Sequence, residues 1–358
     1  MDAVRSLQAP SLRHRLGWLA FVLLACGHFS VLCCWRSQQF LDLRVYAGYG
    51  ERLPYQGRVL MAWVLHVTAG NSRFRPMLSS VASILPKELR DPYIFVLLLT
   101  TFATMLVAIL VTRASLLVLT GDRRFASWAA LLTIYMAHFN LLAVYGLTYT
   151  LPYDVPALAL FSIGVWLVLT RRYWWLLGVF TLGSLNRETF CFVTLFLALY
   201  TWFQDRQQNT AEDARANWLR RIGPHVVLQA AAWITIRVWL RHLFAHNPLE
   251  SANGVFDFQL AKNLKSLLNP FQWPLFLSLF GFTLPLFVWG YRWIGDRALA
   301  RSTAILIALW APAMMIVGII VEIRIFNELT AFLVPSISLI LWNRWVLPAS
   351  NTSPEPQV

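Results

Sequence analysis

Most of the chain consists of long, continuously apolar stretches separated by short connections rich in arginine. About 20 apolar residues are enough to cross a bilayer as a helix. The stretches lack the alternation of apolar and polar positions that is typical of membrane barrels. The pattern therefore predicts an all-α polytopic membrane protein with about ten transmembrane or half-spanning helices. The predicted helices are Leu16–Trp35, Tyr93–Thr112, Ala126–Tyr145, Val155–Thr170, Tyr173–Leu185, Phe190–Phe203, Pro224–Leu243, Trp273–Tyr291, Ser302–Val321 and Leu329–Trp342.

One apolar stretch, residues 173–203, is too long for one ordinary span and too short for two full spans. Asn186, Arg187 and Glu188 interrupt it near its middle. A charged side chain at the centre of a bilayer costs about 2.5–3.5 kcal/mol on insertion scales. A straight helix would place these polar groups deep in the bilayer, whereas a hairpin brings them to one surface. We therefore predict a helical hairpin with residues 186–189 at its tip.

The short connections indicate an orientation. Arginines gather at positions 123–124, 171–172, 206–221 and 292–301. Basic residues are enriched in short cytoplasmic loops. The predicted hairpin places all four groups on the same side, together with the N-terminus, so we expect both termini to be cytoplasmic.

The same topology makes residues 1–358 a single transmembrane domain with two long outer connections and a short inner tail. The connections are residues 36–92 and 244–272, and the tail is 346–358. Residues 57–67 in the first connection have apolar side chains at helical spacing. Such segments are predicted to lie along the membrane surface.

Composition supports this class of protein. Of the 358 residues, 58% are hydrophobic and only 13% are charged, which excludes a disordered chain and disfavours an ordinary cytosolic enzyme. The net charge of +13 is better explained by basic residues that flank spans and meet anionic headgroups than by nucleic-acid binding.

With this topology, membrane-proximal polar residues from four distant parts of the sequence face outward. The first cluster contains Asp42, Arg44, Tyr46, Tyr55, Gln56 and Arg58. The second contains Tyr149, Tyr153 and Asp154, and the third contains Asn186, Arg187, Glu188 and Thr189. The fourth contains Glu322, Arg324, Asn327 and Glu328. All four could line one cavity.

These residue types fit group transfer at a carbon activated by phosphate. Arginines bind phosphate through paired N–H groups, and a carboxylate can take a proton from an attacking hydroxyl. Aromatic side chains such as Tyr55 and Tyr153 can pack on sugar faces. No cofactor is required. Carboxylates could hold Mg²⁺ or Mn²⁺, but no ligand spacing requires a metal.

Each cluster also has a purely structural interpretation. Asp154 could cap a helix, and Arg187 with Glu188 could be an ion pair that fixes the hairpin. The charges at 322–328 could simply be solvated at a helix end. Asp42 in a polar loop is a weak signal when taken alone.

In these clusters the chain resembles the GT-C superfamily of membrane glycosyltransferases, which use polyprenyl-phosphate-linked sugars, and in particular a bacterial branch of it. The resemblance is carried by four strings in order: Tyr55-Gln56-Gly57-Arg58-Val59-Leu60, Tyr153-Asp154-Val155-Pro156, Leu185-Asn186-Arg187-Glu188-Thr189 and Glu322 to Leu329.

The resemblance implies an active site at the periplasmic face and an acidic general base in the first outer loop. Asp42 matches that base by position, although many members carry two adjacent acidic residues and this chain has Asp42-Leu43. A large soluble C-terminal domain, as in oligosaccharyltransferases, is not expected. This favours a small enzyme that acts on a lipid-linked glycan or an envelope polymer.

The leading hypothesis is an inverting glycosyltransferase of the bacterial inner membrane. Its expected partners are a polyprenyl-phosphate-linked sugar, a glycan or lipid acceptor and membrane lipids. Candidate catalytic residues are Asp42, Asp154 and Glu188, and the candidate substrate-binding residues are Arg44, Tyr55, Gln56, Arg58, Tyr153, Asn186, Arg187, Glu322, Arg324 and Glu328. Three alternatives remain open: a transporter or flippase of lipid-linked sugars, a glycan polymerase or ligase, and a scaffolding subunit.

Overall fold

The computed structural model describes residues 12–37, 40–143, 150–208, 210–250 and 258–347. Within these ranges the regular structure is helical, apart from one isolated bridge between Leu53 and Leu249. Tyr149 and most of the predicted tail at 346–358 lie outside the described residues.

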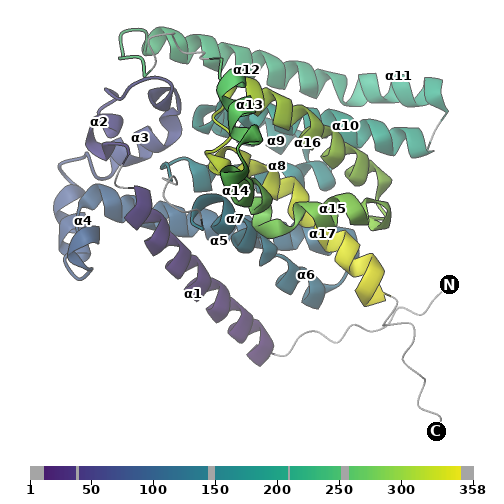
Figure 1. Ribbon diagram of the computed structural model, residues 1–358, viewed down its shortest axis with the longest axis horizontal. Coiled ribbons are helices and arrows are strands. Elements are labelled where there is room, and N and C mark those ends of the chain that lie inside the picture. The colour runs from purple at the N-terminus through teal and green to yellow at the C-terminus, as the bar shows by residue number, and fades with distance from the viewer. Residues whose placement is uncertain (1–11, 38–39, 144–149, 209, 251–257, 348–358) are drawn as a thin grey trace.

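Eight longer helices make up the body of the protein (Figure 1). They are α1 (Leu12–Ser37), α5 (Pro92–Thr120), α8 (Asp154–Leu169), α9 (Tyr173–Asn186), α10 (Cys191–Gln208), α12 (Gly223–Leu243), α16 (Arg297–Val317) and α17 (Thr330–Leu341). The shorter helices are α2 (Leu43–Ala47), α3 (Val59–Val67), α4 (Arg75–Ala82), α6 (Arg123–Ala129), α7 (Leu132–Leu141), α11 (Ala211–Arg221), α13 (Leu260–Leu268), α14 (Trp273–Leu277) and α15 (Leu284–Gly290). Short 3-10 segments include η1 (Tyr55–Gly57), η3 (Glu188–Phe190), η4 (Pro270–Gln272), η5 (Leu279–Phe282) and η7 (Ile323–Leu329).

Several of these helices are suited to a membrane. Four helices among the described residues are long and apolar enough to cross a bilayer, and α8 is a shorter apolar helix. The four are Leu12–Trp35, Pro92–Thr120, Arg297–Val317 and Ile323–Val346. The fold is therefore that of an α-helical protein suited to a membrane, as the sequence predicts.

Two predicted helices are not continuous. The prediction over 126–145 is wrong because α6 ends at Ala129 and α7 begins at Leu132. The prediction over 273–291 is wrong because η5 interrupts it with positive φ angles at Phe280, Gly281 and Phe282. Helix α7 holds this turn, since Asn140 accepts from the Phe280 N–H at 2.9 Å. Such a break depends on a partner helix and leaves no trace in the local apolar pattern.

The predicted break between two helices at residues 186–189 is confirmed. Helix α9 ends at Asn186, Arg187 is extended (φ −157°, ψ 139°), and α10 begins at Cys191 after the η3 turn. At the other end of the pair, Arg221 bonds Asp205 of α10 at 2.8 Å. The ring of His225 lies 4.6 Å from Trp174 at the start of α9. The start of α9 and the end of α10 therefore both lie beside residues 221–225, at the opposite end of the two helices from the tip.

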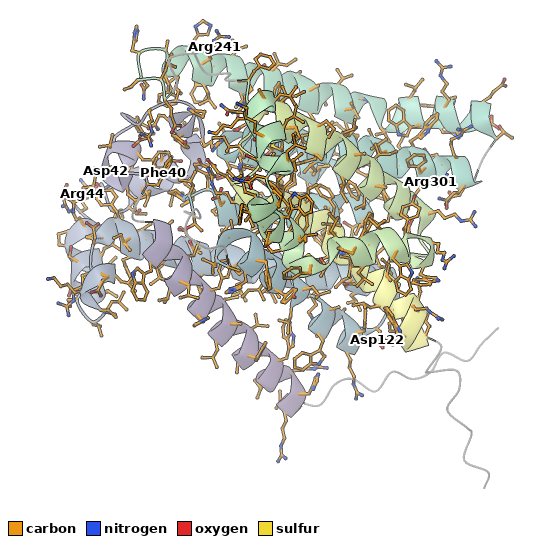
Figure 2. The ribbon with its side chains drawn as sticks, in the orientation of Figure 1. Phe40, Asp42, Arg44, Asp122, Arg241 and Arg301 are labelled. Atoms are coloured by element: carbon orange, nitrogen blue, oxygen red, sulfur yellow. The ribbon has the colours of Figure 1, made fainter. Side chains whose placement is uncertain are left out.

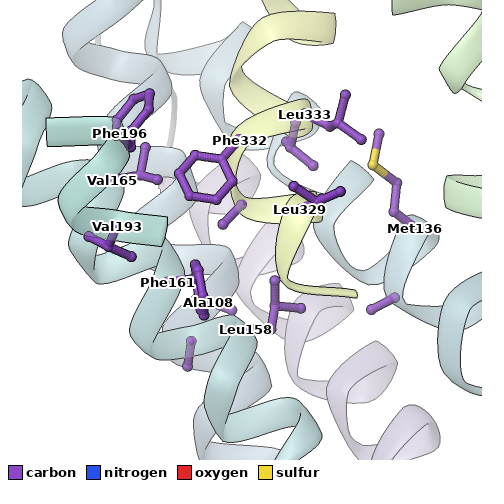
Figure 3. Close-up of a cluster of buried hydrophobic side chains, with 14 of the residues drawn as sticks. Ala108, Met136, Leu158, Phe161, Val165, Val193, Phe196, Leu329, Phe332 and Leu333 are labelled. Atoms are coloured by element: carbon purple, nitrogen blue, oxygen red, sulfur yellow. The ribbon is translucent and has the colours of Figure 1, made fainter. Parts of the chain in front are cut away.

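A core of buried apolar side chains, among them Phe161 of α8 and Phe332 of α17, lies inside the bundle (Figure 3). Phe161 of α8 packs edge-on against Phe190 at the tip, with ring centroids 4.8 Å apart, and against Phe332 of α17 at 5.9 Å. Gly164 permits the approach of α10, because a Cβ at this position would lie 2.9 Å from Val193. Edge-to-face pairs of this kind stabilise a core beyond the burial of their area.

The two ends of the bundle differ in their polar residues. Helices α8 and α10 end at arginine-rich connections, and α16 begins at another. The Tyr200 hydroxyl of α10 lies 3.2 Å from Asp296, directly before α16, so these helix ends lie together. Figure 2 shows Arg301 at this end, whereas Asp42 lies at the opposite end of the molecule. The hairpin tip belongs to the end that carries Asp42, since α8 starts there and α9 finishes there.

Candidate functional site

Five charged side chains form a chain of contacts inside the bundle, at the end where the hairpin tip lies. We call this group the inner ionic chain. Arg187 contacts Glu328 and lies 3.3 Å from Asp154 through Nη1. Arg324 lies 3.5 Å from the same Asp154 oxygen, Oδ1, and its Nη2 lies 2.6 Å from Glu322. The side chains of Asp154 and Glu328 are fully buried and that of Arg187 is 4% exposed. Residues from three of the four predicted clusters therefore contact one another, whereas one cavity lined by all four clusters stays a prediction.

A second group lies nearer the surface, and we call it the outer ionic triad. Arg58 holds Glu188 with two hydrogen bonds, from Nη2 at 2.5 Å and from Nε at 3.1 Å. Arg237 of α12 lies 3.9 Å from the same carboxylate. The side chain of Glu188 is 41% exposed, whereas that of Arg58 is 9% exposed. Glu188 is therefore the most exposed side chain of the triad, since Arg237 is 22% exposed.

Tyr153 links the two groups. The Arg58 guanidinium donates to the Tyr153 hydroxyl and lies 4.5 Å from the centre of its ring. The Arg187 guanidinium lies 5.8 Å from the same ring. Tyr153 is fully buried, so one aromatic ring separates the inner ionic chain from the outer ionic triad.

The local backbone explains why the hairpin tip contributes one side chain to each group. Arg187 is extended, and successive side chains of an extended segment point to opposite sides. Arg187 therefore turns inward to Asp154 while Glu188 turns outward to Arg58. The tip is held by Asn186, which donates to the Tyr153 carbonyl at 3.0 Å, and by Trp233, which donates to the Glu188 carbonyl at 2.9 Å.

The structural roles that the sequence allows for Asp154, Arg187 and Glu328 differ from the contacts of these residues in the structure. Asp154 does not cap α8; its Oδ2 accepts from the Leu151 N–H at 2.8 Å, upstream of the helix. The ion pairs of Arg187 join it to Asp154 and Glu328 rather than to its sequence neighbour, Glu188. Glu328 is buried rather than solvated.

Two other predicted residues support the loop before α3. Gln56 is buried and accepts from the Glu51 N–H at 3.0 Å. Tyr55 packs edge-on against Phe40, with 5.4 Å between ring centroids. Both side chains shape the connection that presents Arg58.

Asp42 and Arg44 lie in a different environment. Both line a pocket of about 370 Å³, whose other walls come from Phe40, Leu41, Leu43, Asp91, Tyr93 and Ile94. Asp42 is exposed and caps α2, because its Oδ1 accepts from the N–H groups of Arg44 at 2.8 Å and Val45 at 3.3 Å. The Arg44 guanidinium pairs with Asp91 at 2.5 Å. These contacts do not include the inner ionic chain or the outer ionic triad.

Helix α2 nevertheless joins the pocket to the triad. Tyr46 lies one helical turn after Asp42, is fully buried, and donates its hydroxyl to the Arg58 carbonyl. It packs in the same apolar cluster as Tyr55 and Tyr153. The exposed carboxylate of Asp42 and the backbone of Arg58 are therefore positioned by the same short helix.

Arg237 is a member of the outer ionic triad that the sequence analysis did not single out. A signal was present, since it is an arginine inside the apolar stretch 224–243. Its guanidinium donates to the Ser184 carbonyl as well as facing Glu188. Charged residues inside apolar helices are functional candidates by default, so this position belongs with Arg58.

Formal charges separate the two groups. The inner ionic chain has three carboxylates and two guanidinium groups, for a net charge of −1, while the outer ionic triad has a net charge of +1. Burial alone would raise the pKa of Glu188, but the adjacent Arg58 and Arg237 guanidinium groups lower it below its usual value. By formal charge, the outer ionic triad is therefore the group that matches an anionic ligand.

The contacts of these carboxylates do not form a metal-binding site. Among the residues that the structure describes, no three His, Cys, Asp or Glu side chains are grouped to hold a metal ion. The carboxylates of both ionic groups face guanidinium groups instead. We therefore assign no step to a divalent cation.

Comparison of the chain with protein-family models, with curated proteins and with solved structures gave no match. The functional argument consequently depends on the geometry of the hairpin end.

Proposed function

We propose that the protein is an inverting glycosyltransferase that moves a sugar from a polyprenyl-phosphate donor to a glycan or lipid acceptor. One observation carries this proposal: carboxylates and guanidinium groups from four distant segments meet at one end of an apolar helical bundle, close to a pocket with an exposed carboxylate. The reaction needs those three elements, namely a cation for the phosphate, a base for the acceptor and access from the membrane.

Asp42 is assigned as the general base because it is exposed and lines the pocket. The acceptor hydroxyl oxygen attacks the anomeric carbon while its proton passes to the Asp42 carboxylate. The bond from carbon to phosphate oxygen breaks, and its electron pair leaves with polyprenyl phosphate. Glu188 is the alternative base, since its carboxylate is the exposed one in the outer ionic triad.

The donor phosphate is assigned to Arg58 and Arg237. The sequence predicts that Arg58, Arg187 and Arg324 all bind substrate, but the last two are buried among carboxylates of the inner ionic chain. The net positive charge of the outer ionic triad favours a phosphate there. Arg187 and Arg324 then act as positioning residues that hold the segments of the site together.

The membrane orientation is part of the same proposal. The arginine-rich connections face the cytoplasm by the positive-inside rule, so the hairpin end faces the periplasm of a bacterial inner membrane. The proposed topology combines the candidate spans with shorter helices such as α9, which has 14 residues and crosses only part of the bilayer. An active site at this end receives a lipid-linked donor without any soluble carrier.

The decisive experiment compares two aspartates with the same structural role. Asp42 caps α2, and Asp122 caps α6 through hydrogen bonds from the N–H groups of Arg124 at 2.7 Å and Phe125 at 2.9 Å. Asparagine caps a helix about as well as aspartate, so each Asp→Asn change retains the cap. The two residues lie at opposite ends of the molecule (Figure 2).

The assay uses proteoliposomes with undecaprenyl-phosphate hexoses carrying a tritiated sugar and a mixed envelope-glycan acceptor. Asp42→Asn should lower transfer roughly 10²- to 10⁴-fold, the usual contribution of a general base, while Asp122→Asn retains full transfer. Equal activity of Asp42→Asn and the unmodified protein removes Asp42 from the mechanism. Glu188→Gln, measured in the same series, then tests the alternative base.

A second candidate function, transport of a lipid-linked sugar, is favoured by the helix break at Arg187 beside buried charges, a feature of transport pathways. Proteoliposomes without acceptor separate the two functions. Movement of the labelled headgroup across the bilayer, with no transfer once acceptor is supplied, would support the transporter and contradict the transferase. A polymerase or ligase would instead require a preassembled glycan as the donor.

A further inference from the structure

The second long connection contains a helix, α13, whose apolar face is exposed in the part of the chain that the structure describes. On α13, Leu260, Leu264 and Leu267 recur at helical spacing, and all three are exposed. Lys262 and Lys265 occupy a different face of the same helix and are also exposed. A short helix with leucines on one face and lysines on another is typical of a helix that lies in a membrane interface.

The residues that follow α13 extend this apolar surface. Leu268 is 80% exposed and Phe271 in η4 is 95% exposed. Trp273 at the start of α14 is also exposed, and its indole donates to the Leu267 carbonyl at 2.9 Å. Tryptophan is enriched where a membrane meets water, and this hydrogen bond holds it beside the leucine face.

Hydrogen bonds place α13 at the end of a candidate span. Asn263 is buried and donates to the carbonyls of Met315 at 2.9 Å and Gly318 at 2.7 Å. The Gln259 N–H donates to the Ile316 carbonyl at 2.9 Å. These three carbonyls belong to the last turn of α16 and the residue after it. Because α16 is long and apolar enough to cross a bilayer, a bilayer spanned by α16 would have its headgroups near α13.

We propose that α13, with η4 and the start of α14, is an amphipathic anchor that binds an anionic lipid surface. The leucines, Phe271 and Trp273 enter the boundary between headgroups and acyl chains. Lys262 and Lys265 pair with lipid phosphates, since basic side chains at this depth are attracted to anionic headgroups. A lipid surface fits better than a protein partner because the helix is fixed to the end of a span and carries positive charge beside its apolar face.

The anchor is coupled to the inner ionic chain. Asn263 also accepts from the Ile320 N–H at 3.1 Å. Ile320 lies two residues before Glu322, which contacts Arg324. Lipid binding at α13 therefore fixes the segment that enters η7, independently of which reaction the site performs.

Spin labels test the anchor without an activity assay. Single cysteines at Leu264, Leu268 or Lys265 are labelled with a nitroxide in a full-length chain whose four native cysteines are replaced. The protein is placed in nanodiscs of phosphatidylcholine alone or with phosphatidylglycerol at 3:1. The labels at 264 and 268 should be more accessible to oxygen than to a water-soluble nickel complex, and the label at 265 should show the reverse.

Water exposure of the labels at 264 and 268 overturns the proposal, and so does their shielding from both reagents, which would indicate a protein partner. A second arm tests the charge. With both lysines present, the label at 264 should move deeper into the bilayer when phosphatidylglycerol is added. In the double variant Lys262→Gln/Lys265→Gln, this shift should be absent. Arg215→Gln/Arg220→Gln on α11 is the matched control and should leave that shift unchanged. A shift that persists in the lysine variant overturns the anionic-lipid assignment.

Discussion

Asp154 and Asp42 carry the same functional group in opposite surroundings. Asp154 is fully buried, with its Oδ1 facing Arg187 and Arg324, so its charge is compensated within the protein. Asp42 is exposed at a pocket, where its carboxylate caps a short helix. The contrast separates a carboxylate whose charge the protein itself compensates from one that a ligand can reach.

The same contrast has an energetic side. Removing one partner of a buried ion pair leaves the other charge buried without compensation, which costs about 3–5 kcal/mol. An exposed ion pair contributes about 0–1 kcal/mol, because water and salt screen it. The pairs Arg187–Asp154 and Arg44–Asp91 represent these two limits within one protein.

The largest effect is expected for Arg187→Met, which keeps an unbranched side chain and removes the charge shared by Asp154 and Glu328. The free energy of unfolding in detergent micelles should fall by about 3–5 kcal/mol, as measured by denaturant titration. Adding Asp154→Asn and Glu328→Gln to the same chain should restore part of the loss, since no uncompensated carboxylate then remains. A loss below 1 kcal/mol for Arg187→Met would mean that the inner ionic chain is not structural.

The sequence predicts which charged segments come together better than it predicts which side chains form ion pairs. Polar residues interrupting an apolar stretch predict the hairpin, and its tip is where they place it. The sequence also suggests that Arg187 and Glu188 pair, but the extended backbone at Arg187 separates their side chains. The real partner of Glu188 is Arg58, which lies 130 residues away in sequence. Long-range partners depend on how helices pack, which no local pattern records.

Helix continuity shows the same limit. Residues 273–291 are apolar enough for a span, yet the segment turns at Phe280 to Phe282 because α7 supplies hydrogen bonds. Asn140 accepts from the Phe280 N–H, and the Tyr135 hydroxyl donates to the Gly281 carbonyl at 3.0 Å. Hydropathy predicts burial in lipid or protein but does not distinguish a spanning helix from a turn held by a neighbour.

An intermediate effect that depends on pH is expected at Glu188, which lies between α9 and α10 and outside the candidate spans. Its pKa in the folded protein is lowered by Arg58 and Arg237 despite partial burial, relative to about 4.3 in an unfolded chain. The stability from its ionised form is therefore fully present above the unfolded value and is lost as pH falls through the folded one. Glu188→Gln should lower Tm by the same amount at pH 6 and pH 8.

The difference in Tm between Glu188→Gln and the unmodified protein should then shrink below about pH 4. Glu212→Gln, at an exposed position on α11, is the control and should leave Tm unchanged across the series. A difference that grows as pH falls would contradict the ion pair between Glu188 and Arg58.

The smallest effect is expected for Arg44→Gln, at the pocket that holds Asp42. The Arg44 side chain is 62% exposed, and its partner Asp91 is 28% exposed. Its loss should change the free energy of unfolding by less than about 1 kcal/mol. The change should also vanish at about 1 M salt, where the screening length is near 3 Å. A loss as large as that of Arg187→Met, or one that salt does not reduce, would mean that the pocket wall is as structural as the inner ionic chain. The exposure of Asp42 would then no longer support its assignment as the general base.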